Sequence, residues 1–117
     1  MIPLSYTVVS HNRMIFNLVD IYARIPSDTE ILLTHTPPHE VLDKTRRGKH
    51  AGCDVLAARL EQLHACRLHV FGHIHEAHGA SIAGEKDQDG ANDRTGRVSI
   101  NAALPLDKQA IVIDLKN

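Results

Sequence analysis

Three histidines follow short apolar segments and are candidate metal ligands. The stretch "LHVFGHIH" places His73 and His75 directly behind an apolar run, and His35 follows the run "ILLT". Imidazole nitrogen binds Mn, Fe, Zn and related ions. Because the chain has nine histidines in 117 residues, roughly one H-x-H pair is expected by chance. Spacing alone therefore leaves open a metal site and an ordinary histidine-rich turn.

The place of these histidines in the chain is more informative than their spacing. In open α/β sheets, ligands bind beyond the carboxyl ends of the strands, and His35, His73 and His75 all lie where an apolar strand is expected to end. If His73 and His75 continue the strand direction, their side chains share one face about 6 to 7 Å apart. Such a pair suits two ions held roughly 3.5 to 4 Å apart. Gly72 would allow a close approach of the backbone.

The elements that position these residues are predicted from hydrophobic periodicity and from turn formers. Helical spacing predicts a helix over 13–24 and a second over 54–64, with Asp54 as a candidate N-cap. Strands are expected at 30–35 and 68–72, a marginal one in "LSYTVVS", and a further one in "GASIAG". An exposed loop at 84–96 and two terminal strands within 97–115 complete the list. This order predicts a single α/β domain that ends in antiparallel pairing.

Composition adds little about function. Thirteen basic and fourteen acidic residues leave the chain near neutral, so bulk charge gives no reason to expect a nucleic-acid or membrane surface. No segment approaches the length of a membrane span, and no basic leader precedes an apolar stretch, so we expect a cytoplasmic protein. Cys53 and Cys66 have neither disulfide-framework nor metal-ligand spacing, and we expect two reduced, half-buried thiols.

The motifs "LLTHTPP", "HAGCDVL" and "LHVFGHIHEAHG", in this order, resemble the C-terminal half of the calcineurin-like metallophosphoesterase superfamily, in its metallophosphoesterase-domain-containing branch. The resemblance covers residues 15–115. It implies the C-terminal half of a two-sheet sandwich flanked by helices. It also implies two divalent ions of the Mn, Fe or Zn type, and hydrolysis of phosphate esters by a hydroxide that bridges them.

Ligands are carried over from the resemblance one residue at a time. His35 matches the lone histidine that binds the second metal, His73 matches the first histidine of G-H-x-H on that same metal, and His75 matches the histidine that binds the first metal. Thr36 stands where the family usually has glycine.

Several family motifs are absent from the sequence. It has no D-x-H, no G-D and no G-N-H-D/E, which in the family supply the bridging aspartate and the proton donor to the leaving group. We therefore expect the isolated chain to be inactive, and to self-associate or to pair with an N-terminal fragment. The alternative is a non-catalytic remnant that binds a partner or a single metal ion. A mononuclear structural site is a weaker alternative, because three histidines and a water are typical of open sites.

Other polar residues are secondary candidates. His50 could face a substrate phosphate, although an exposed loop position is the simpler interpretation. Asp43 and Glu76 could orient ligand imidazoles, or be solvated loop acids. His69 is expected to point outward from its strand, and Asn101 to have a structural turn role.

Overall fold

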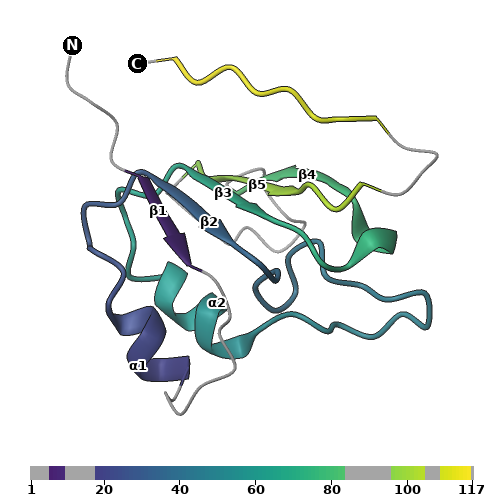
Figure 1. The fold of residues 1–117 in the computed structure, drawn as a ribbon, viewed down its shortest axis with the longest axis horizontal. Helices are drawn as coiled ribbons and strands as arrows, with labels where there is room; N and C mark the ends of the chain where they lie inside the picture. The colour runs from purple at the N-terminus through teal and green to yellow at the C-terminus, as the bar shows by residue number, and fades with distance from the viewer. Residues whose placement is uncertain (1–5, 10–17, 84–95, 105–108, 117) are drawn as a thin grey trace.

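The computed structural model describes residues 6–9, 18–83, 96–104 and 109–116. Its elements, in chain order, are β1 (Tyr6–Val9), α1 (Leu18–Ala23), β2 (Ile31–Thr34), α2 (Asp54–Leu60), β3 (Leu68–Phe71), the 3₁₀ turn η1 (His75–Ala77), β4 (Gly79–Ile82) and β5 (Val98–Asn101). Strands and helices alternate until β3, and then two more strands follow (Figure 1).

The five strands form one mixed sheet in the order β1-β2-β3-β5-β4. The first four of these are parallel neighbours, and β4 pairs with β5 in the antiparallel sense. The predicted α/β class and its antiparallel end are confirmed. The strands expected in "LSYTVVS" and "GASIAG" also form, as β1 and β4. A single mixed sheet with few helices is compatible with part of a metallophosphoesterase-type domain.

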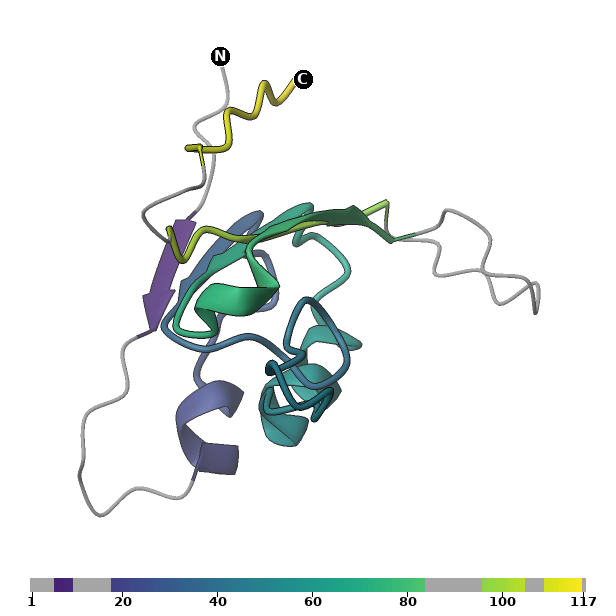
Figure 2. The same ribbon diagram turned by 90° about the vertical axis from the view of Figure 1, so that its right-hand side faces the viewer.

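One face of the sheet carries the main core. Helices α1 and α2 both lie on this side, as Figure 2 shows. Leu32 from β2 packs there with a cluster of helix and loop residues: Tyr22, Ile25, Leu56, Leu60, Leu63 and Cys66. Desolvation by burial raises the pKa of the Cys66 thiol. Cys66 is fully buried and Cys53 half-buried, and both are free thiols.

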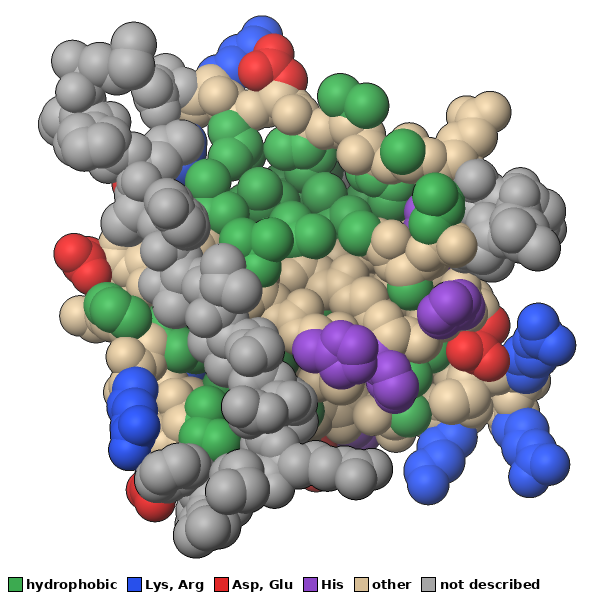
Figure 3. Space-filling view, viewed as in Figure 1, with side chains coloured by type: hydrophobic (Ala, Val, Ile, Leu, Met, Phe, Trp, Pro, Cys, Tyr) green, Lys and Arg blue, Asp and Glu red, His purple; other side chains and the backbone are tan. Residues whose placement is uncertain are grey.

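The opposite face of the sheet is apolar across four strands. Paired residues on neighbouring strands point to the same face, and the register aligns Ile31, Leu68, Val98 and Ile82 in one row and Leu33, Val70, Ile100 and Ala80 in the next. Figure 3 shows hydrophobic side chains in a continuous area between the sheet and the C-terminal segment. We call these two rows the apolar sheet face.

Both helices differ at one end from their predicted ranges. For the first, α1 begins at Leu18, and 13–17 lie outside the described residues. The second ends at Leu60 rather than at residue 64, because Gln62 and Leu63 turn tightly, with amides that donate to carbonyls three residues back. Cys53, not Asp54, is the N-cap of α2, and its sulfur accepts from the Leu56 amide at 3.5 Å.

The second predicted terminal strand is wrong. Among the described residues of the range 97–115, β5 is the only strand, and residues 109–116 lie in no strand. The alternation of the segment has another cause, because Ile111, Ile113 and Leu115 are half-buried, whereas Val112 is 92% exposed. The segment instead runs over the apolar sheet face, opposite the helices (Figure 2). Residues 84–95 of the predicted loop lie outside the described part of the chain, and Gly96 is exposed.

A search of the described ranges for membrane spans found no helix with the length and hydrophobicity needed to cross a bilayer.

Candidate functional site

The sheet brings His35 and His73 together at the carboxyl ends of β2 and β3. These strands are parallel neighbours in register, so the residues that follow them meet at one edge. The two imidazole rings have centroids 4.9 Å apart, and both side chains are exposed. The amide of Gly72 donates to the His35 carbonyl at 3.0 Å and joins the two loops. We call His35 and His73 the histidine pair.

His73 has a strained backbone. Its φ is 72°, and the Ile74 amide donates to the Gly72 carbonyl at 2.9 Å across it. This is a γ-turn with positive φ, the rarer and more strained form, and such positions cost of order 1–3 kcal/mol for a residue with a side chain. Strain of this kind concentrates at functional sites.

The predicted extended path through His73 and His75 is wrong. The chain turns sharply at His73, because of the γ-turn, and His75 then begins η1. The expected shared strand face with a spacing of 6 to 7 Å therefore does not form. His75 is exposed, and within the described ranges no group of three histidine, cysteine, aspartate or glutamate side chains is arranged to hold a metal ion.

His69, predicted to point outward, is fully buried on β3. The strand packs under the helices on this side, so alternation does not bring the side chain to solvent. The Thr34 hydroxyl donates to the Thr36 carbonyl at 2.9 Å. Its one proton is thereby used, so in the contact of 2.8 Å between Thr34 Oγ1 and His69 Nε2 the imidazole N–H donates.

This chain of two hydrogen bonds fixes the turn that carries His35. Residue Thr36, placed where glycine was expected, has no positive φ. Desolvation, and next the charge of Arg97, lower the pKa of His69 to about 3. The imidazole is therefore neutral at physiological pH and suited to this single-donor role.

Asp43 and His50 form a second, unpredicted arrangement in the loop between β2 and α2. Asp43 is 1% exposed, so it is not a solvated loop acid. Its Oδ1 lies 2.7 Å from His50 Nδ1, and its Oδ2 accepts from the amides of Glu40 and Gly52, each at 2.9 Å. Desolvation by itself would raise the pKa of Asp43, but these hydrogen bonds outweigh it and hold the pKa below its ordinary value.

The partners of Asp43 determine what His50 can do. Because the carboxylate orients Nδ1, Nε2 is the ring nitrogen that remains for a ligand. The ring of His39 lies beside that of His50, with centroids 5.7 Å apart. His39 Nδ1 lies 3.3 Å from Asp54 Oδ1. Glu76 is directed to the hairpin loop, where its Oε2 accepts from the Arg46 amide at 3.3 Å.

Asn101 has the structural role expected for it. It is fully buried, and its amide group donates to the carbonyls of Leu42 and Ile74 at 3.0 and 2.9 Å. Its Oδ1 accepts from the Ala103 amide at 3.0 Å. One side chain at the end of β5 thus holds the β2–α2 loop against the loop after β3 that contains His73.

A groove of about 380 Å³ between α1 and α2 lies elsewhere. Aliphatic side chains dominate its lining, and no histidine contributes to it. It has none of the donors that the strand-end loops bring together, so the histidine pair is the better candidate site.

Sequence comparison with known proteins finds relatives of this chain. No protein-family model matches the chain. A UPF0046 protein of Caenorhabditis elegans is 32% identical over 98 residues, which are 84% of this chain and 23% of that protein. Metallophosphoesterase domain-containing protein 1 of Homo sapiens is 38% identical over 68 residues, 57% of this chain and 21% of that protein.

The chain is a relative of the metallophosphoesterase-domain-containing proteins. The predicted resemblance is thereby confirmed. A third match, 42% identical over 62 residues, is to the probable rhamnogalacturonate lyase C of Emericella nidulans, but it covers 52% of this chain and only 6% of that protein. The chain spans less than a quarter of the length of each of these relatives.

Sequence reasoning found the histidine pair but missed the groups behind it. Nothing in the local pattern "THTPP" shows that Thr34 accepts from a histidine in another strand, because the contact joins residues far apart in the sequence. The Asp43 and His50 arrangement had a weak signal, namely an acid and a histidine at the two ends of a short charged segment. A hairpin prediction over that segment would have paired them.

Proposed function

We propose that this chain is the part of a metal-dependent phosphoric ester hydrolase that supplies histidine ligands from the carboxyl ends of β2 and β3. The observation that carries the proposal is the meeting of His35 and His73, with ring centroids 4.9 Å apart, at neighbouring parallel strand ends. The strained γ-turn supports the proposal, because backbone strain that costs folding free energy is found mainly at functional sites.

The donors fit a metal ion in part. Two imidazoles suit Mn, Fe or Zn, and His75, at the start of η1, is proposed as a further ligand. The described residues gather no third donor beside the histidine pair, and hard cations need carboxylates. The remaining ligands would therefore come from outside this set of residues. When bound, two ions would activate water as the nucleophile and offset charge on the phosphoryl oxygens.

The chain's own side chains would bind and orient. His35 and His73 would hold the metal, and the His69 and Thr34 hydrogen bonds would keep the His35 turn in place. His50, fixed by Asp43, would present Nε2 to a substrate phosphate. With so few ligands, we expect the isolated chain to bind metal weakly and to show no turnover.

A second candidate is a non-catalytic module that binds one metal ion or a partner. The observation that favours it is the lack of a three-donor group in the described residues.

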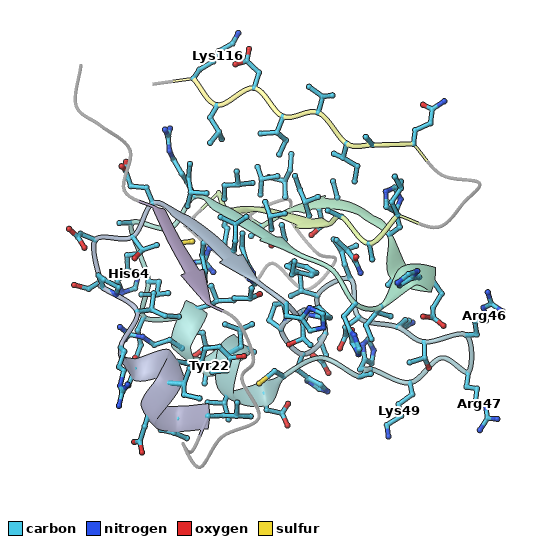
Figure 4. All side chains as sticks on the ribbon, viewed as in Figure 1. Tyr22, Arg46, Arg47, Lys49, His64 and Lys116 are labelled. Atoms are coloured by element: carbon cyan, nitrogen blue, oxygen red, sulfur yellow. The ribbon has the colours of Figure 1, made fainter. Side chains whose placement is uncertain are left out.

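Metal titration calorimetry with Mn²⁺ and Zn²⁺ tests the primary proposal. His73→Gly removes the ligand while glycine accepts the positive φ, so this variant should fold at least as stably as the parent chain. We expect its metal affinity to fall about tenfold or more. His64→Gln, which changes an exposed histidine at a distance from the site (Figure 4), is the matched control and should keep the parent affinity.

Equal affinities for the parent chain and His73→Gly would refute the histidine pair as a metal site. A phosphodiesterase assay with bis(p-nitrophenyl) phosphate and Mn²⁺ addresses activity. Metal-dependent turnover that is lost in His73→Gly would overturn the expected inactivity and eliminate the non-catalytic module.

A further inference from the structure

A cluster of cations occupies the tip of the hairpin within residues 43–52. Lys44, Arg46, Arg47 and Lys49 fall within six residues, and all four are exposed. Figure 4 shows the labelled Arg46, Arg47 and Lys49 extending away from the body of the molecule. The whole chain has a formal charge of −1, so this concentration of positive charge is local. We call residues 43–52 the basic hairpin.

No acid in the described part of the chain forms an ion pair with these four cations. The ion pairs found among the described residues all involve histidine. Asp43 is directed into the base of the hairpin, and Glu76 accepts from the backbone amide of Arg46 rather than from its guanidinium. The tip therefore has a positive potential that acts on ligands in solution.

The basic hairpin has a defined backbone. Thr45 and Lys49 are joined by an amide-to-carbonyl bond of 2.8 Å, and the Gly48 amide donates to the Thr45 carbonyl at 2.8 Å. Gly48 has a φ of 78°, which glycine adopts without strain. At the base, the Ala51 amide donates to the Asp43 carbonyl at 3.1 Å. A preorganised arrangement loses less entropy when it binds a ligand.

The basic hairpin also adjoins the loop that carries the proposed metal ligands. The bond from the Arg46 amide to Glu76 joins it to η1, which begins at His75. Asn101 joins Leu42, at its base, to Ile74, next to His73. These bonds hold the basic hairpin next to the loop that contains His73 and His75.

We propose that the basic hairpin binds a second phosphate group, so that the site selects ligands with two or more linked phosphates. This inference rests on the proposed function, in which the histidine pair and its metal take the scissile phosphate. The arginine fork matches phosphate oxygens in pairs, and lysine adds point charge. Single-stranded nucleic acid fits less well, because base stacking needs aromatic side chains and the chain has two Tyr, two Phe and no Trp.

Titration calorimetry of the whole chain, without added metal, tests the basic hairpin separately from the histidine pair. Tripolyphosphate should bind more tightly than orthophosphate. Arg46→Gln combined with Arg47→Gln should weaken tripolyphosphate binding about tenfold or more and lessen its salt dependence. The control is Arg24→Gln combined with Lys116→Gln, which removes two exposed charges elsewhere and should leave binding unchanged.

Several outcomes would overturn the inference. These are equal loss in both double variants, equal affinity for the two phosphates, or tighter binding of a short oligonucleotide with the same number of phosphate groups. His73→Gly distinguishes the two proposals, because it should keep tripolyphosphate binding. If that variant also keeps its metal affinity, the histidine-pair proposal fails while the hairpin result stands.

Discussion

His69 has an environment that excludes its charged form. The side chain is fully buried, Nε2 donates to Thr34, and Nδ1 has no hydrogen-bond partner within the described residues. A proton on Nδ1 would place a charge in the core near the Arg97 guanidinium, and the lowered pKa has these two causes. Protonation would therefore favour the unfolded chain.

We predict that His69 makes the fold sensitive to acid. The pKa of His69 is about 3 in the folded chain, against an ordinary value of 6.5. Between these two pH values the unfolded chain binds a proton that the folded chain does not bind. Above pH 6.5 this group does not lower the free energy of unfolding, and between pH 6.5 and 3 it should lower that free energy by about 1.4 kcal/mol per pH unit.

Urea unfolding across that pH range measures the effect. His69→Gln keeps an N–H donor for Thr34 but does not titrate, and the difference between its curve and that of the parent chain isolates His69. Parallel curves for the two proteins would show that the imidazole is not held neutral.

At the scale of the elements, the side chain of Arg97 connects β5 to the end of α2 through hydrogen bonds. Arg97 is buried just before β5 and donates to the carbonyls of Leu60, Leu63 and Cys66 at 2.8 to 2.9 Å. These carbonyls lie at and beyond the carboxyl end of α2, where backbone acceptors lack helical partners and a cation is favourable.

Arg97→Met should destabilise the fold by about 3 kcal/mol or more. The substitution keeps an unbranched apolar stem but removes the charged donor from three carbonyls, of which those of Leu60 and Leu63 keep an amide donor. Hydrogen bonds from charged groups contribute about 1.5–3 kcal/mol each. Arg47→Met in the basic hairpin is the matched control and should remain within about 0.5 kcal/mol of the parent chain. Chemical denaturation of both variants provides the test, and equal values would contradict this role.

Local pattern predicted the elements well where local chemistry determines them. The runs at Ile31 and Leu68 gave β2 and β3, because proline or glycine follows soon after each. It failed where a distant neighbour decides. The segment 109–116 alternates like a strand, but it lies over the apolar sheet face and pairs with no strand. Alternation along β3 predicted that His69 faces solvent, but the helices cover that face of the strand and bury the side chain.

The candidate site, like the elements, was predicted only in part. Strand ends located His35 and His73, whereas a γ-turn at a non-glycine residue has no sequence signature, and the burial of Asp43 depends on amides at positions 40 and 52.

At the scale of the whole molecule, the apolar sheet face lacks a complete cover. Leu33 is 36% exposed and Ile82 is 53% exposed. In the segment over it, Ile111, Ile113 and Leu115 are only half-buried, and Val112 is 92% exposed. Apolar areas of this kind mark interfaces. A second sheet from a longer chain, or a second copy of this one, would bury it.

We predict that the purified chain self-associates through this face or binds a complementary N-terminal fragment. Leu33→Thr combined with Ile82→Thr keeps strand propensity while lowering the hydrophobicity of the face, and should shift sedimentation velocity profiles towards monomer. Val19→Thr, on the exposed side of α1, should not. A parent chain that sediments as a monomer at all concentrations and melts cooperatively would contradict this prediction.

The position of β5 between β3 and β4 has a consequence for synthesis. A ribosome makes β4 before β5, yet β5 is the strand through which β4 joins the sheet. While residues 83–97 are being made, β4 lacks this partner and the edge of β3 stays open. Open strand edges in partly folded chains pair with wrong partners. The nascent chain should therefore be most prone to aggregation just before residue 101 emerges, and slow translation over that interval would increase the loss.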